Sequence, residues 1–278
     1  MKLGINVCFA VKRLTEPEAW AEFVRADLGL DTVQFTFDLI DPWWPEAFRG
    51  SLIRRTREAA DAWGLTIGTA FVGSAHYVPA GLLDPDPAAR SIARQWWRRA
   101  CDVAGELGAT VVGGPLGTLS VREAADPTAR ARRYVGLLDS IEAITCHAAA
   151  AGLREFLIEP TPLAREIPST ITQSLHLLNG LHGRCPIPVG FTLDTGRASA
   201  ESWITGLGAN IRMLQVDGHV DLAPIAASIR AARLGDISAI LELRPRFEDD
   251  DEKVRRELAA SVAYCREHLD QGVTIRIS

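Results

Sequence analysis

Short apolar segments with the composition of β-strands recur along the whole chain, and stretches rich in Ala, Leu, Arg and Glu separate them. Successive segments start about 34 residues apart, which is enough for one strand, one helix and two loops. We predict strands at 2–8, 31–37, 65–71, 109–114, 154–159, 188–194, 212–217 and 238–243. We predict helices at about 17–28, 50–63, 88–107, 127–151, 169–182, 200–208, 223–234 and 250–268. The 278 residues therefore divide into eight βα units.

Glycine lies between the end of a predicted helix and the start of the next predicted strand at several places. The positions are Gly29, Gly64, Gly108 and Gly152. Glycine is preferred just beyond a helix end because it adopts a positive φ without a clash of a Cβ atom. The repeated junction supports the assignment of alternating helices and strands.

Eight βα units can form either a closed (β/α)8 barrel or an open, doubly wound sheet. An open sheet that binds a dinucleotide requires a Gly-rich fingerprint after its first strand, but CFAVKRLTEP (8–17) contains no glycine. The glycines of GGPLG (113–117) do not have the GxGxxG spacing either. Because no linker or break in composition divides the chain, we predict a single α/β domain, a (β/α)8 TIM barrel, over 1–278.

Charge and cysteine content narrow the expected partners and compartment. The chain has 35 Asp and Glu against 30 Lys and Arg, a net charge of −5, so a broad basic face for nucleic acid is not expected. Five dispersed cysteines fit reduced thiols in a cytoplasmic protein. The N-terminus lacks the layout of a signal peptide, and no apolar stretch is long enough to span a membrane. We therefore expect a cytoplasmic protein without nucleic-acid or membrane partners.

Polar residues end or lie within the last four predicted strands. They are Glu159, Asp194, Gln215, Asp217 and Glu242. Catalytic groups of a (β/α)8 barrel gather at the carboxyl ends of the strands, and one such residue by itself is commonly only solvated. Several on consecutive strands would repel one another, and a divalent cation is the simplest way to hold carboxylates together. Hard oxygen ligands suit Mg²⁺ or Mn²⁺ better than a structural zinc ion.

Four short motifs carry a resemblance to a known family: FLIEPTP, FTLDTGR, MLQVDGH and ILELRPR. With them the chain resembles, over essentially its whole length, the xylose isomerase-like TIM barrels, which include ketose 3-epimerases, hydroxypyruvate and 2-oxo-tetronate isomerases and inosose dehydratase. Gln215 in place of a His is similar to the hydroxypyruvate and tetronate isomerases. The segment VQFTFDLIDPWWP (33–45) resembles barrels that act on tetruloses or apiose.

The resemblance implies one divalent cation, Mn²⁺ or Mg²⁺, as cofactor. Its implied ligands are Glu159, Asp194, Gln215 and Glu242. His219 is the alternative to Gln215 as the ligand of the seventh strand. The resemblance also implies that Glu159 and Glu242 are the catalytic acid and base.

The activity that the resemblance implies is that of a metal-dependent sugar isomerase or epimerase. Such an enzyme interconverts a ketose and an aldose, or inverts a carbon beside a carbonyl, by proton transfer through a metal-stabilised enediolate. One alternative is a lyase or dehydratase acting on a keto sugar or keto-inositol. Another is a catalytically inactive barrel subunit, which the retained set of ligands disfavours.

Five further residues are candidates for binding a small sugar substrate, each with a solvated surface position as the alternative. They are Trp43, His76, Arg197, His219 and Arg244. Arg197 stands where many members of the family have a His, three residues after the Asp, and it can bind a carboxylate or phosphate through two hydrogen bonds. Arg244 has the same strand parity as Glu242, so both can point toward the barrel mouth.

Two polar residues and two tryptophan pairs complete the set of candidates. Asn6, on the first predicted strand, and Gln34, on the second, are weaker candidates for the pocket. Trp43 and Trp44 lie in a loop bounded by prolines, whereas Trp96 and Trp97 lie within a predicted helix. We expect one of the first pair to cover the sugar pocket or pack against a neighbouring subunit, and the second pair to lie partly in the core and partly at a subunit contact. The aromatic pairs thus favour a homodimer or homotetramer.

Overall fold

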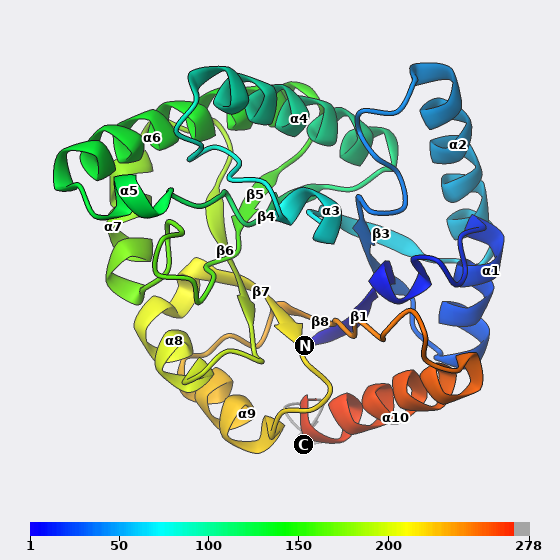
Figure 1. Ribbon diagram of the computed structural model, residues 1–278. Helices are drawn as coiled ribbons and strands as arrows, with labels where there is room; N and C mark the ends of the chain where they lie inside the picture. The colour runs from blue at the N-terminus through cyan, green and yellow to red at the C-terminus, as the bar shows by residue number, and fades with distance from the viewer. Residues whose placement is uncertain (270–278) are drawn as a thin grey trace. The chain divides into compact units, whose positions relative to one another are not determined.

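Eight parallel strands form a closed barrel in the order of the sequence, from β1 to β8, in the computed structural model, which describes residues 1–269 (Figure 1). The strands are β1 (Lys2–Asn6), β2 (Thr32–Thr36), β3 (Thr66–Phe71), β4 (Val111–Gly114), β5 (Glu155–Ile158), β6 (Val189–Asp194), β7 (Ile211–Val216) and β8 (Ser238–Leu241). Each overlaps the segment in which it was predicted. The closed order confirms the (β/α)8 barrel and excludes the open, doubly wound sheet.

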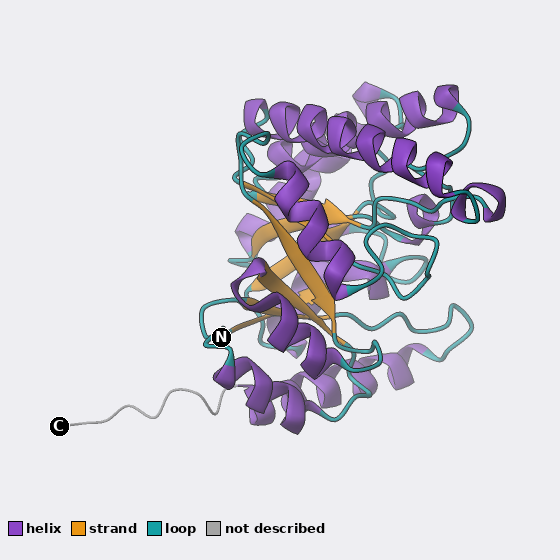
Figure 2. Ribbon diagram, turned by 90° about the vertical axis from the view of Figure 1, so that its left-hand side faces the viewer, coloured by secondary structure: helices purple, strands orange, loops and turns teal. Residues whose placement is uncertain are grey.

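The main helices alternate with the strands along the chain. Figure 2 draws the helices in purple and the strands in orange. They are α1 (Pro17–Glu22), α2 (Glu46–Ala62), α4 (Pro87–Glu106), α6 (Pro127–Ala150), α7 (Ile171–Leu181), α8 (Ala200–Leu207), α9 (Leu222–Ala231) and α10 (Asp251–Leu269). Helix α2 begins at Glu46 rather than near residue 50, because Pro45 fits the start of a helix and Glu46 suits its first turn. The first predicted helix continues from α1 as a π-helix, η2 (Phe23–Asp27).

Short helical turns were not predicted from the sequence. They are η1 (Val7–Ala10), α3 (Ser74–Tyr77), α5 (Val121–Ala124) and η3 (Gly208–Asn210). A single turn spans too few residues to show a helical period of apolar side chains. One consequence concerns the site, because His76 was expected in a loop and lies on α3 instead.

Local chemistry explains where the long helices start and stop. Asp86 and Asp126 cap α4 and α6 by accepting hydrogen bonds from backbone N–H groups of the first turn, and proline follows each of them. Glycines with positive φ follow four helices, as predicted. They are Gly29, Gly64, Gly108 and Gly152. The junctions that suggested αβ repeats are thus real helix ends.

The chain divides into two compact units. The first comprises 1–35, 55–67 and the chain from 193 onward, and the second comprises 36–54 and 68–192. In the first unit β1 pairs with β2 and with β8, and β7 pairs with β8. In the second unit β3, β4, β5 and β6 pair in sequence. A single domain over 1–278 stays a prediction, and 270–278 lie outside the described residues.

The core of the second unit contains the tryptophan pair of α4. Trp96 is 6% exposed and Trp97 is 3% exposed. Trp97 packs edge-on against Phe156, and Trp96 packs edge-on against Phe37, with ring centroids 5.2 and 5.4 Å apart. Helix α4 also packs along α6 (Figure 1). The core position predicted for this pair is therefore confirmed, and its part in a subunit contact stays a prediction.

All five cysteines are free, and their environments predict very different reactivity. Burial raises the pKa of the Cys101 thiol to about 12 and that of the Cys265 thiol to about 11, whereas Cys146 is exposed. Because the thiolate is the reacting form, we expect a thiol reagent such as Ellman's reagent to label Cys146 first. Cys146→Ser should remove the fast phase of labelling, and Cys101→Ser should leave it. A fast phase that survives in Cys146→Ser would contradict this assignment.

Candidate active site

Four polar side chains of the first unit form a hydrogen-bonded network. Asn6 Nδ2 donates to Gln34 Oε1 at 2.7 Å and, at 3.3 Å, to Glu242 Oε1. Gln215 Nε2 donates to the same Gln34 oxygen at 3.1 Å. The three amide side chains are buried, with 2% or less of each exposed. Polar groups buried this deeply are retained only when they are hydrogen-bonded, so the network is a built feature of this unit.

The register of the parallel strands brings these residues together. Asn6 is the last residue of β1 and lies opposite Gln34 of β2. Gln215 is next to last on β7, and Glu242 follows β8 directly, where its N–H donates to the Val216 carbonyl at 2.9 Å. Neighbouring parallel strands end at the same edge, so residues near their carboxyl ends share one site. Asn6 and Gln34, which were predicted only as weaker candidates, are thus central to this group.

Two half-buried carboxyl groups of this unit have raised pKa values. Burial is the main cause for Asp194, the last residue of β6, and also for Glu242. The negative charge of Asp217 raises both pKa values further, and Asp194 acts on Glu242 in the same way. Arg244 lowers both without cancelling the shift. Such a group of carboxyl side chains is stabilised by an added positive charge.

One side-chain oxygen of this group lacks a hydrogen-bond donor among the described residues. Gln215 Oε1 is buried and accepts no hydrogen bond from residues 1–269. No three His, Cys, Asp or Glu side chains in that range are grouped closely enough to form a metal site by themselves. The donors that the first unit does offer are the carboxylates of Asp194 and Glu242 and this amide oxygen. A set of oxygen donors with net negative charge fits a hard divalent cation.

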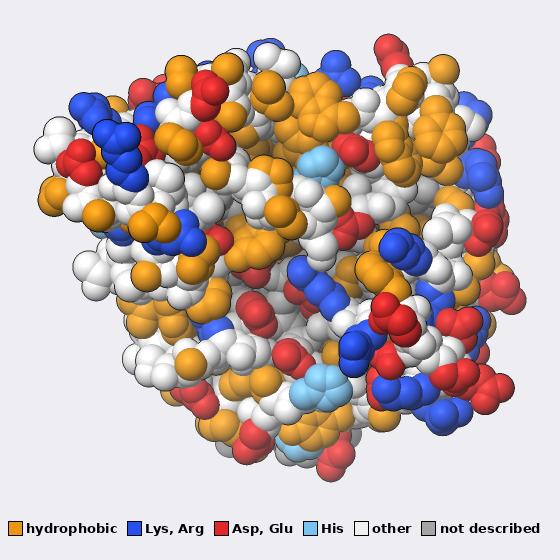
Figure 3. Space-filling model, in the orientation of Figure 1, with side chains coloured by type: hydrophobic (Ala, Val, Ile, Leu, Met, Phe, Trp, Pro, Cys, Tyr) orange, Lys and Arg blue, Asp and Glu red, His pale blue; other side chains and the backbone are white. Residues whose placement is uncertain are grey.

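Two arginines of the first unit lie beside these carboxylates. Arg244 Nη2 is 2.8 Å from Glu242 Oε1, and about half of the Arg244 side chain is exposed. The guanidinium of Arg197 lies 3.9 Å above the ring of Trp203 on α8, and it lowers the pKa of Asp194. Figure 3 shows acidic side chains in red next to basic ones in blue near the ends of β7 and β8. The site thus offers positive charge to an anionic group.

His219 does not lie on β7, the strand on which it was the alternative ligand to Gln215. It follows β7 in an exposed loop, and its backbone N–H donates to Asp217 Oδ1 at 2.9 Å. Gln215, by contrast, lies on β7 itself, and its side chain is buried. The alternatives for the seventh strand therefore differ in burial, and Gln215 is the better placed for a ligand.

Glu159 belongs to the second unit. It directly follows β5, it is half-buried, and its N–H donates to the Gly114 carbonyl at 3.2 Å. This bond continues the ladder between β4 and β5 by one residue beyond the end of β5. Glu159 therefore occupies the same kind of position after its strand as Glu242 occupies after β8.

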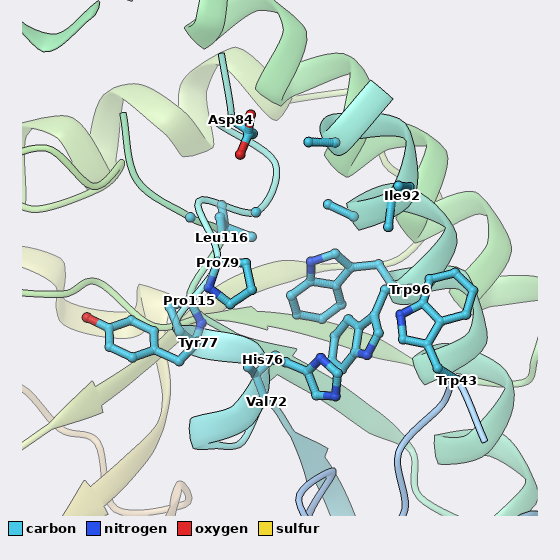
Figure 4. A pocket seen from close by; sticks show the side chains of 15 residues that line it. Trp43, Val72, His76, Tyr77, Pro79, Asp84, Ile92, Trp96, Pro115 and Leu116 are labelled. Atoms are coloured by element: carbon cyan, nitrogen blue, oxygen red, sulfur yellow. The ribbon is translucent and has the colours of Figure 1, made fainter. Parts of the chain in front are cut away.

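A cavity of about 210 Å³ in the second unit brings together two of the predicted substrate-binding residues, Trp43 and His76 (Figure 4). The ring of His76 lies 4.5 Å from that of Trp96, centroid to centroid, and its Nε2 is 3.3 Å from Asp41 Oδ1. Arg99 lies over the ring of Trp43 at 4.7 Å. Aromatic faces and one oriented imidazole suit a small polar ligand that has C–H surfaces.

Two acidic residues of the second unit were missed by the sequence analysis. Asp41 orients His76 and also accepts a hydrogen bond from the Trp43 N–H at 2.8 Å. Its position before Pro-Trp-Trp was a usable signal, because Asp commonly accepts such a bond from the residue two positions on. Glu166 is 5% exposed and accepts hydrogen bonds from Tyr77 and Thr161. Nothing in the local sequence distinguishes Glu166 from a solvated acid.

Comparisons with known proteins agree with this architecture. A family model described as xylose isomerase-like TIM barrel matches residues 24–224. The D-erythrulose 1-phosphate 3-epimerase of Brucella abortus is 24% identical, over 98% of this chain and 97% of its own length. A crystal structure of a candidate xylose isomerase from Rhodospirillum rubrum has a TM-score of 0.90 and 31% identity, covering 97% of this chain and 98% of the other. The D-psicose 3-epimerase of Clostridium cellulolyticum, with a TM-score of 0.73 and 18% identity over 97% of this chain and 99% of its own, is alike in fold.

Proposed function

The chain belongs to the xylose isomerase-like TIM barrel family and is an enzyme of the isomerase and epimerase class, and we propose that it acts on a small ketose with the help of one divalent cation. The observation that carries this proposal is the group of Asp194, Gln215 and Glu242. The pKa values of its two half-buried carboxyls are raised, and its buried amide oxygen accepts no hydrogen bond from residues 1–269. No helix within residues 1–269 has the length and apolarity needed to cross a membrane.

The proposed ligands of the cation, Mn²⁺ or Mg²⁺, are oxygen atoms of strand-end residues. They are Glu159, Asp194, Gln215 and Glu242. When bound, a divalent cation supplies positive charge that stabilises the negative charge developing on the substrate oxygens as a proton leaves the neighbouring carbon. The two half-buried carboxyls of the first unit support this assignment, because the charge of Asp194 raises the pKa of Glu242 and a bound cation would offset that repulsion.

Proton transfer is assigned to Glu159 and Glu242. One carboxylate removes the proton from the carbon beside the carbonyl, and the other returns it, so that the enediolate forms and collapses within the site. Burial raises the pKa of Glu242 and so brings it closer to the pH at which the enzyme works. A group whose pKa lies near the working pH both accepts and releases protons readily. Asn6 Nδ2 and Arg244 Nη2 both donate hydrogen bonds to Glu242 Oε1, which hold this carboxylate in one orientation.

The substrate-binding residues fall into two kinds by chemistry. Arg197 and Arg244 suit a phosphate or carboxylate group, and the phosphorylated substrate in the name of the Brucella abortus relative supports this assignment. His76 and Trp43 suit the hydroxyl groups and C–H faces of a sugar. His219, in its exposed loop, is proposed to contact the outer end of the substrate.

The proposal also includes compartment and assembly. Five free cysteines support a reducing compartment such as the cytoplasm. The exposed Trp43 supports a homodimer or homotetramer, and the buried Trp96 and Trp97 add little to that support. Sedimentation equilibrium of the purified protein measures the assembly directly, and a monomer at micromolar concentration would contradict this part of the proposal.

The function is tested by isotope exchange. The purified protein is incubated in D₂O with Mn²⁺ and with tetruloses, pentuloses, their 1-phosphates and keto-inositols, and products are followed by NMR and mass spectrometry. An epimerase or isomerase incorporates deuterium at the carbon beside the carbonyl and yields a rearranged sugar. An unsaturated product would instead identify a lyase. No exchange with any substrate of the panel would contradict the proposal, and an inactive subunit would be the alternative.

Removal of the metal gives a separate prediction. Treatment with EDTA followed by its removal should abolish exchange, and Mn²⁺ should restore it, because the cation stabilises the developing charge. At a Mn²⁺ concentration of about 100 times Kd, binding should stabilise the folded state by about 2.7 kcal/mol, which raises Tm by several degrees. The control is the metal-free protein in buffer that contains NaCl in place of the Mn²⁺ salt at equal ionic strength. Full activity in the metal-free protein would contradict the assignment of a cation.

A further inference from the structure

The orientation of the Gln215 side chain is set by a chain of hydrogen bonds that starts at a backbone atom. The N–H of Cys8, in the turn η1, donates to Asn6 Oδ1 at 2.8 Å. A backbone N–H is always a donor, so the oxygen of Asn6 must face it. The Asn6 nitrogen is thereby directed toward Gln34 Oε1, at 2.7 Å.

The orientation of Gln34 follows from that of Asn6. Its oxygen must face the donating Asn6 nitrogen, and its own nitrogen then lies 3.1 Å from the sulfur of Met213, a weak acceptor. The same Gln34 oxygen accepts from Gln215 Nε2 at 3.1 Å. Turning any one of the three amides by 180° would set two donors or two acceptors against each other, so the set is locked in one arrangement.

Gln215 therefore has only one end left for another partner. Its nitrogen is bound to Gln34, and its buried oxygen accepts no hydrogen bond from the described part of the chain. An amide nitrogen has no lone pair to offer a cation, whereas an amide oxygen is a good ligand for Mg²⁺ and Mn²⁺. Asn6 also donates to Glu242 Oε1, so the same network touches a second oxygen donor.

We propose that Asn6 and Gln34 are positioning residues that hold Gln215 with its oxygen, not its nitrogen, toward the divalent cation. The inference rests on the proposed function, since it assumes that a cation binds here. An amide ligand has an oxygen and a nitrogen, so neighbouring hydrogen bonds must hold its oxygen toward the cation. A carboxylate ligand has two oxygens and does not depend on such hydrogen bonds. The need for Gln34 is therefore tied to the amide of Gln215.

A double-mutant cycle on metal affinity tests this dependence. The Kd of Mn²⁺ is measured by electron paramagnetic resonance of the free ion for wild type, Gln34→Met, Gln215→Glu and the double variant. Gln34→Met should weaken binding about tenfold in the wild-type background, because Gln215 is then free to turn. In the Gln215→Glu background the same change should not weaken binding, because a carboxylate presents an oxygen whichever way it turns and no longer needs Gln34 as its acceptor. Equal weakening in both backgrounds would overturn the proposal.

Control variants separate orientation from general damage. Gln173→Met makes the same replacement on α7, at a half-buried glutamine whose oxygen accepts from Ser169, and it should leave Kd unchanged. Gln34→Glu keeps an oxygen that accepts from both Asn6 and Gln215, so it should fold and bind Mn²⁺ at least as tightly as wild type. Weaker binding by Gln34→Glu would overturn the proposed roles of Asn6 and Gln34 even if Gln34→Met did not fold.

The outcomes that would overturn the roles of Asn6 and Gln34 differ from those that would overturn the proposed function. Folded wild-type protein that binds no Mn²⁺ would overturn both, since there would be no cation to orient toward. Wild-type protein that binds Mn²⁺, with equal effects of Gln34→Met in both backgrounds, would overturn only the roles of Asn6 and Gln34. Thermal unfolding followed by circular dichroism reports whether each variant is folded.

Discussion

Replacing Glu242 with Gln is expected to lower kcat about a thousandfold, which corresponds to about 4 kcal/mol of transition-state stabilisation. The substitution keeps the shape and the Oε1 acceptor that Asn6 and Arg244 use, but it removes the carboxylate that accepts and returns the proton. It also removes one negative charge from the proposed donors of the cation. The measurement is deuterium exchange under saturating Mn²⁺ and substrate.

Glu248→Gln is the matched control for this change. Glu248 is exposed in the loop between β8 and α10, six residues beyond Glu242, so the same loss of charge there should leave kcat unchanged. Glu159→Gln is expected to lower kcat by a similar factor to Glu242→Gln if the two act as acid and base. Wild-type exchange rates in both Glu159→Gln and Glu242→Gln would show that neither carboxylate transfers the proton.

Replacing Gly113 with Ala is expected to destabilise the protein by about 3 kcal/mol, at the upper end of ordinary overpacking. Gly113 lies on β4, and a Cβ atom there would press into the carbonyl oxygen of Leu157 on β5 and lie 2.6 Å from Phe71 Cε2 on β3. A backbone carbonyl within a strand ladder cannot move aside without loss of hydrogen bonds. Urea unfolding followed by circular dichroism measures the change in the free energy of unfolding.

Gly68→Ala provides the comparison on a neighbouring strand. Gly68 lies on β3, and no atom lies within 4 Å of the position that a Cβ would take. Alanine there should be neutral or stabilise the folded state by up to about 1 kcal/mol, because it restricts the unfolded chain. Equal effects of the two substitutions would show that close packing is not the reason for glycine at position 113.

The repeating pattern of the chain was sufficient to predict its architecture. Apolar runs, helix caps and glycines at helix ends act over a few residues each, so the sequence displays them directly. Residues at strand ends, such as Asp194 and Glu242, were predictable for the same reason, since parallel strands of a barrel end at one edge. Short turns such as α3 were not, because four residues show no period.

The contacts between residues far apart in the chain were beyond the sequence. Gln34 and Gln215 are 181 positions apart, and Asn6 and Gln34 are 28 apart, so no local pattern links them. The sequence showed only that each is a polar residue in an apolar run, which does not say whether its partner is water, a ligand or another side chain. The pairing of His76 with Asp41 was hidden in the same way.

The sequence alone determined the number and order of the βα units and which polar residues at the strand ends are candidate oxygen donors. Both follow from local periodicity and from the geometry that every parallel strand shares. Only the tertiary structure decided how those donors are turned. The direction of an amide depends on which neighbour donates and which accepts, and here that choice passes from the Cys8 backbone through Asn6 and Gln34 to Gln215.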